Sequence, residues 1–118
     1  MVLKPDDFTE HAQEVIAKSQ DAVRQFRHSQ WDVEHILLAL LEQEDGVASE
    51  IFRHLGVSID DLSERVNNLL DDGPKVAHES TQIFVSPRAL RVLERAKEES
   101  LRLNDDFISS EHLLVAVV

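Results

Sequence analysis

Cysteine is absent from the 118 residues, and glycine and proline occur only three times each. Without thiols the chain has no disulfide framework, no thiolate metal site and no cysteine nucleophile. The glycines Gly46, Gly56 and Gly73 are isolated from one another, which excludes a glycine-rich phosphate loop and, with it, ATP hydrolysis in this chain. With 42% hydrophobic and 30% charged residues, the remaining composition is that of one globular domain, 1–118.

Positive charge is scarce as well, with 12 basic against 23 acidic residues and a net charge of −11. Such a surface repels phosphate backbones and anionic membranes, so we expect neither nucleic acid nor a membrane as partner. The longest apolar run, near Ile36 to Leu41, is far too short to span a bilayer, and the charged start at 4–7 does not resemble a signal peptide. We therefore expect a soluble, cytoplasmic protein.

Apolar residues recur at helical spacing through most of the chain. Thr9, Asp32, Ser58, Ser86 and either Ser109 or Ser110 stand where side-chain caps begin helices. The spacing predicts six helices, over about 10–27, 33–41, 47–55, 59–70, 87–103 and 111–118. We expect a tight corner at 30–31, and a short extended piece at 82–85 within the linker.

Positions 8–41 align without a gap with positions 85–118, at an offset of 77 residues. The cap, the apolar stripe and the start of the second helix recur in register, which predicts a tandem helical repeat. The fold class is therefore all-α with pseudo-twofold symmetry: repeat one at 8–72, a linker at 73–84 and repeat two at 85–118. Repeat two stops inside its second helix, so by its own symmetry we expect roughly thirty further residues.

The doubled Glu-His pair at 34–35 and 111–112 is the most specific local feature. In one interpretation each Glu completes a helix cap while each His packs between the repeats. In the other, an open helix N-terminus and a carboxylate form a polar pocket for a group that carries both charges. The six histidines show no zinc spacing and the paired aspartates no calcium-loop spacing, so we expect no metal site and no catalytic residues.

The repeated motif resembles the Clp N-terminal repeat domain, which precedes the AAA+ rings of ClpB- and ClpC-type unfoldases. The resemblance rests on four segments, Phe8-Thr9-Glu10-His11-Ala12, Asp32-Val33-Glu34-His35-Ile36-Leu37-Leu38-Ala39-Leu40, Ser86-Pro87-Arg88-Ala89 and Phe107-Ile108-Ser109-Ser110-Glu111-His112-Leu113-Leu114. It implies a non-catalytic module that presents unfolded or aggregated polypeptides, or adaptor proteins, to a hexameric ring. That parent ring uses ATP and magnesium and in some relatives joins a protease, whereas this chain needs no cofactor.

The resemblance also implies two kinds of site. A ClpB-like substrate groove between the repeats would have Thr9, Asp105 and Glu111 on its polar rim and Ile16 and Leu93 as apolar lining. ClpC-like phosphoarginine sites would include Glu34 in the first repeat and Ser109, Ser110 and Glu111 in the second. Asp32–Val33 replace the family's Gly-Thr, so the second site is the better candidate. The rival interpretation is a structural or regulatory domain that controls ring assembly or the ATPase.

Overall fold

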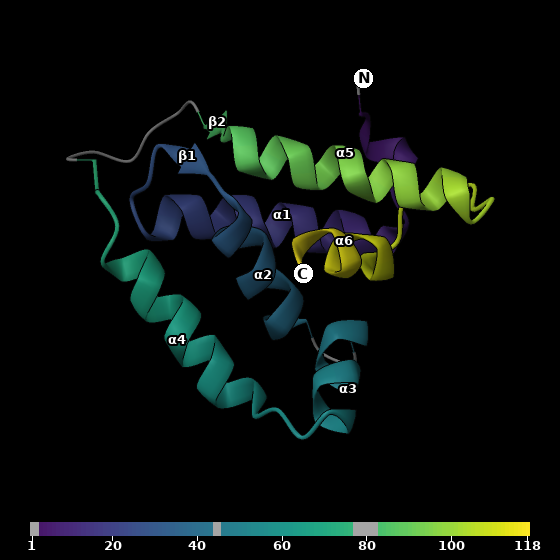
Figure 1. The fold of residues 1–118 in the computed structure, drawn as a ribbon. Helices are drawn as coiled ribbons and strands as arrows, with labels where there is room; N and C mark the ends of the chain where they lie inside the picture. Colours follow the sequence, from purple (N-terminus) through teal and green to yellow (C-terminus); the bar gives the residue numbers. More distant parts are fainter. Residues whose placement is uncertain (1–2, 44–45, 77–82) are drawn as a thin grey trace.

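The computed structural model describes residues 3–43, 46–76 and 83–118. In chain order the elements are η1 (Pro5–Asp7), α1 (Glu10–Gln25), β1 (Gln30–Trp31), α2 (Val33–Glu42), α3 (Val47–His54), α4 (Ile59–Asp71), β2 (Phe84–Val85), α5 (Pro87–Arg102) and α6 (Ser110–Val117) (Figure 1). The helical fold predicted from the spacing is confirmed, with helix bounds within two residues of those expected. None of these helices has both the length and the apolar character needed to cross a membrane.

The first helix of each repeat begins at the predicted hydroxyl cap. Thr9 accepts a hydrogen bond from the Ala12 N–H at 3.2 Å, and Ser86 accepts one from the Ala89 N–H at 3.0 Å. These side chains satisfy backbone donors that have no partner inside the helix. Pro87 stands at the first helical position, where its missing N–H costs nothing. The two long helices are therefore started locally, by matching chemistry.

The same two helices also end alike. Arg27 and Asn104 have left-handed backbones, with φ of 57° and 58°, directly after the helix caps. The next N–H, of His28 or Asp105, donates to a carbonyl five residues back at 2.9 or 2.8 Å. This arrangement closes a helix and reverses the chain. It brings His28 and Asp105 to equivalent places in the two repeats.

Short parallel strand pairings connect the repeats. β1 pairs with β2, and Phe8 forms an isolated parallel bridge with Ile108. The prediction of a simple corner at Gln30–Trp31 is therefore wrong, because these residues form a strand with a partner about 54 positions away. The extended piece expected around 82–85 is confirmed at Phe84–Val85, while residues 77–82 of the predicted linker lie outside the described part of the chain.

These pairings are related by the same offset of 77 residues. The Thr9 N–H donates to the Ile108 carbonyl, and the Ser86 N–H donates to the Trp31 carbonyl, both at 2.9 Å. In each case the segment before one repeat's first helix pairs with the segment before the other repeat's second helix. The two copies thus exchange main-chain hydrogen bonds about a pseudo-twofold axis.

The main core lies between the two copies and contains residues of α1, α2, α5 and α6. Its fully buried large side chains include Val15, Val23, Ile36, Leu40, Ile108 and Leu113. A second cluster joins α2 to α4, through Leu38, Leu41, Val66 and Leu70. Figure 1 shows α3 and α4 lying beside the four helices of the main core. α4 packs on α2, whereas α3 contacts both α2 and α6 and contributes Ala48 to the main core.

Candidate functional site

The histidines of the doubled Glu-His pair complete the helix caps. The Asp32 N–H donates to His35 Nδ1 at 2.9 Å, and the Ser109 N–H donates to His112 Nδ1 at 2.8 Å. The interpretation that Glu completes the cap is therefore wrong. The glutamates stand one position before the histidines, so their side chains take no part in the caps. Both histidine rings are buried at the N-terminal ends of their helices.

The outer nitrogens of the two histidines meet different partners. His35 Nε2 lies 2.8 Å from His28 Nδ1, whereas His112 Nε2 lies 2.9 Å from Asp105 Oδ2. Burial, and secondarily the neighbouring His28, lowers the pKa of His35 to about 4. The first repeat thus contains two histidine rings in contact where the second contains a histidine beside a carboxylate.

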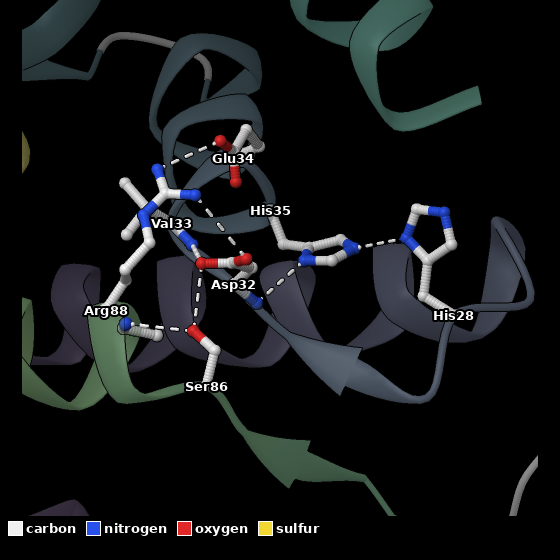
Figure 2. Close-up of polar contacts among 8 residues, drawn as sticks. His28, Asp32, Val33, Glu34, His35, Ser86 and Arg88 are labelled. Carbon is white, nitrogen blue, oxygen red and sulfur yellow. Dashed lines mark hydrogen bonds and ion pairs between the residues drawn. The ribbon is translucent and has the colours of Figure 1, made fainter. Parts of the chain in front are cut away.

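The first-repeat carboxylate Glu34 is occupied by a cation of the chain itself. Arg88 Nη2 donates to Glu34 Oε1 at 3.1 Å, and Arg88 Nη1 lies 3.7 Å from Asp32 Oδ2 (Figure 2). The hydrogen bond from Arg88 to Glu34 raises the pKa of the guanidinium. Ser86 Oγ donates to Asp32 Oδ1 at 2.9 Å and so connects this ion pair to the cap of α5. A guanidinium therefore already fills the predicted first phosphoarginine site.

The equivalent place in the second repeat is an open cavity of about 290 Å³. Most of the residues that line it, which come from both repeats, have polar side chains: Thr9, His11, Gln43, Ser109, Ser110 and Glu111, with Gly46 and Val47. Ser110 is only 5% exposed, yet within the part of the chain that the structure describes its hydroxyl has no hydrogen-bond partner. Among the described residues Glu111 has no ion pair, because the offset of 77 puts His11 where the first repeat has Arg88.

A separate groove, of about 340 Å³, lies between the N-terminal segment, α1 and α5. Ile16 and Leu93, which are equivalent positions in the two repeats, both line it. The rest of its wall is largely apolar and consists of Leu3, Lys4, Pro5, Phe8, Gln13, Ala17, Gln20 and Trp31. The first repeat and the segment before it thus form most of the groove, and among the described residues that line it Leu93 alone comes from the second repeat.

The residues predicted for one substrate groove are divided among three places. Ile16 and Leu93 share the apolar groove, and Thr9 and Glu111 share the polar cavity with Ser109 and Ser110. Asp105 is bound to His112 and lines neither. Arg88 could not be identified from the sequence, because its contact with Glu34 spans 54 residues. His28 was not among the predicted site residues, although the repeat offset aligns it with Asp105 and could have indicated it.

Within the described ranges, no group of three or more histidine, aspartate or glutamate side chains is placed to hold a metal ion. The molecule combines two interlocked helical copies, a groove along α1 and a cavity at the start of α6. These features define an all-α tandem-repeat domain with candidate ligand sites on its surface.

Comparison with known proteins assigns this domain to a family. The sequence profile of the Clp repeat (R) N-terminal domain matches residues 7–118, and the chain belongs to that family. Among curated relatives, chaperone protein ClpB 2 of Synechocystis sp. is 38% identical over 112 residues, and ClpB of Oceanobacillus iheyensis is 32% identical over 111. These matches cover 95% and 94% of this chain but only 13% of each relative.

Solved structures show the same fold. The Hsp104 N-terminal domain from Candida albicans superposes with a TM-score of 0.86 at 23% identity, covering 94% of this chain and 73% of that one. The N-terminal domain of ClpV1 from the E. coli EAEC Sci1 secretion system gives 0.85 at 20% identity, covering 96% and 68%. The predicted resemblance to the Clp N-terminal domain is confirmed.

Proposed function

We propose that this chain is the substrate-recognition module of a ClpB-type chaperone and binds unfolded or aggregated polypeptides without chemistry of its own. The observation that carries the proposal is the apolar groove that Ile16 and Leu93 line. Family membership supports it, since relatives that match over nearly the whole chain are named chaperones. The attached hexameric ATPase ring, adaptor proteins and a cytoplasmic location belong to the same proposal.

The groove suits a ligand without a fixed sequence. Its apolar wall can bury aliphatic and aromatic side chains of many segments, each at a gain of about 25 cal/mol per Å² of apolar area. Few polar groups border it, so few partners are rejected for lack of a matching hydrogen bond. Weak, broad binding is the behaviour expected of a module that captures unfolded chains and passes them on.

An NMR titration with a reduced and alkylated unfolded protein tests the groove. Ala17 is an exposed small residue in the groove wall, so Ala17→Glu adds bulk and charge to the groove without removing any core atom. Gln25→Glu adds the same charge to α1 outside the groove and serves as the matched control. We expect saturable shifts at Ile16 and Leu93 in the wild type and in Gln25→Glu, and none in Ala17→Glu.

A second candidate function is recognition of phosphorylated arginine in the polar cavity, favoured by the unpartnered, buried Ser110 hydroxyl beside Glu111. The carboxylate would bind the guanidinium, and the hydroxyls with the start of α6 would bind the phosphate. Titration with phosphoarginine should shift Ser109 to Glu111 and leave Glu34 unchanged, because Arg88 occupies the latter. Ser110→Ala should abolish the shifts. Silence towards both ligands would favour the structural or regulatory role instead.

A further inference from the structure

The apolar groove between the N-terminal segment, α1 and α5 differs from the rest of the molecule in the charge of its wall. The chain has 23 acidic and 12 basic residues. Accordingly, Asp32 and Glu34 border a cavity at the start of α2, and Glu111 borders the one at the start of α6. Among the described residues that line the groove, however, Lys4 is the one charged residue, and none is an aspartate or a glutamate. The local charge of the groove is therefore opposite to that of the chain as a whole.

The backbone of Lys4 is fixed beside the groove by a short turn. The Lys4 N–H donates to Asp7 Oδ2 at 2.8 Å, and the Asp7 N–H donates to the Lys4 carbonyl at 2.9 Å. The Asp7 carbonyl accepts the Ile108 N–H at 2.8 Å, which connects the turn to the second repeat. Leu3 and Phe8, on either side of the turn, pack in the main core. The position of Lys4 at the groove is therefore part of the fold.

The side chain of Lys4 is available to a ligand. It is exposed, and within the described part of the chain it forms no ion pair. The neighbouring Asp7 carboxylate accepts the Lys4 backbone N–H instead. A lysine side chain is long and flexible, so its ammonium group can approach a carboxylate that is bound at the edge of the groove.

The other side-chain donors of the wall are largely occupied or uncharged. Trp31 Nε1–H donates to Ser19 Oγ at 2.9 Å, and Gln13 Nε2 donates to a main-chain carbonyl of the N-terminal segment at 3.1 Å. Gln20 is neutral. An acidic side chain of a ligand can therefore form a charge-assisted hydrogen bond with Lys4, whereas a basic side chain meets a like charge and no carboxylate of the wall.

We propose that the groove prefers polypeptide segments in which an acidic residue adjoins apolar ones, and that Lys4 determines this preference. The inference rests on the proposed function and adds a charge preference to it. The net charge of −11 does not cancel the effect, because exposed charges more than about 10 Å away are largely screened at physiological salt. A ligand in the groove therefore responds mainly to the charge that lines it.

The experiment uses the full chain and three peptides of the form acetyl-Ser-Leu-Phe-X-Leu-Ser-amide, in which X is Glu, Gln or Lys. NMR titrations followed at Ile16 and Leu93 give the affinity of each peptide. We expect the Glu peptide to bind about threefold more tightly than the Gln peptide, the effect of one exposed ion pair, and the Lys peptide to bind most weakly. The difference should disappear at about 1 M salt, where the screening length falls to about 3 Å.

Substitutions at Lys4 assign the preference to one side chain. Lys4→Gln should make the Glu and Gln peptides bind equally, and Lys4→Glu should make the Lys peptide the tightest. Lys18→Gln removes the same charge from an exposed position of α1 outside the groove, so this control should keep the wild-type order.

Two results would overturn the charge preference while the proposed function stands. They are equal binding of the three peptides to the wild type, and a preference that survives in Lys4→Gln. If none of the peptides shifts Ile16 or Leu93, the groove is not a polypeptide site, and both the inference and the proposed function are overturned.

Discussion

The two repeats use one backbone design and close it with different side chains. Each has a hydroxyl-capped long helix, a left-handed turn and a histidine that caps the next helix. In the first repeat that histidine contacts His28, and in the second it contacts Asp105. The features that both repeats share are the hydrogen bonds that begin and end their helices, which any copy of the fold needs. The side chains that differ are therefore free to acquire separate functions.

The repeats also differ in how much of the outer face of their second helix is buried. Leu38 and Leu41 of α2 are buried under α4, at 3% exposure each. The residue of α6 equivalent to Leu38, Val115, is 60% exposed. Within the described residues, this helix face is therefore core in the first repeat and surface in the second.

Shortening side chains on this helix face should give the largest change in stability and the largest difference between the two repeats. Leu38→Ala leaves a cavity between α2 and α4 and should lower the free energy of unfolding by about 3 kcal/mol. Val115→Ala removes atoms that are already in water and should cost under about 0.5 kcal/mol. Urea denaturation of both variants measures the difference, and equal losses would mean that α6 is covered in solution.

The histidine pair should make stability depend on pH. The folded pKa of His35, about 4, lies below its unfolded value near 6.5, so the unfolded chain takes up the proton first. Stability should therefore fall as the pH drops from 6.5 to 4, by about 3 kcal/mol at most, and this contribution should stay constant below that range.

His28→Asp should reduce this pH-dependent loss of stability, because a carboxylate beside His35 favours its charged form while the burial of the ring still opposes it. Denaturation curves at several pH values compare the two proteins. The facing groups Asp32 and Glu34 are the same in both, so the difference reports the His28 position. An unchanged loss in the variant would contradict the assignment to the histidine pair.

Glycine substitutions at the two left-handed turns should raise the free energy of unfolding by a smaller amount. Arg27 pays a steric penalty at φ 57° that glycine avoids, and Arg27→Gly should raise stability by about 0.5–1 kcal/mol. Asn104→Gly should gain less, since asparagine tolerates this region better. Thermal unfolding of the two variants orders the gains, and a loss of stability in Arg27→Gly would show that the arginine side chain matters more than the backbone.

Removal of the Arg88 ion pair should have the smallest effect on stability. The arginine side chain is 56% exposed, so Arg88→Ala should cost about 0.5 kcal/mol, with Arg91→Ala as the exposed control. Arg88→Ala should have a larger effect on binding, because the freed Glu34 carboxylate becomes accessible. Phosphoarginine should then shift the NMR signals of Glu34 as well as those of Glu111. If Glu34 still does not respond, occupancy by Arg88 is not what distinguishes the two repeats.

Most of the helical fold could be predicted from the sequence because its signals are local. Thr9, Asp32, Ser58, Ser86 and Ser109 precede helices in the sequence as they do in the structure. The strand at Gln30–Trp31 could not be found, since two residues carry no alternating pattern and their partner is distant in the chain. The glutamate caps were misassigned because histidine is an unusual residue at this cap position, and capping rules favour glutamate.

The sequence by itself determined the helices, the repeat and the position of the groove residues Ile16 and Leu93 at equivalent places. It did so because helix periodicity and caps act over three or four neighbours. Only the tertiary structure decided that Arg88 neutralises Glu34, that Glu111 lines a cavity, and that His35 contacts His28 where His112 contacts Asp105. These outcomes depend on which side chains the folded chain brings together from distant positions. Contacts between residues so far apart in the chain produce no periodic pattern in the sequence.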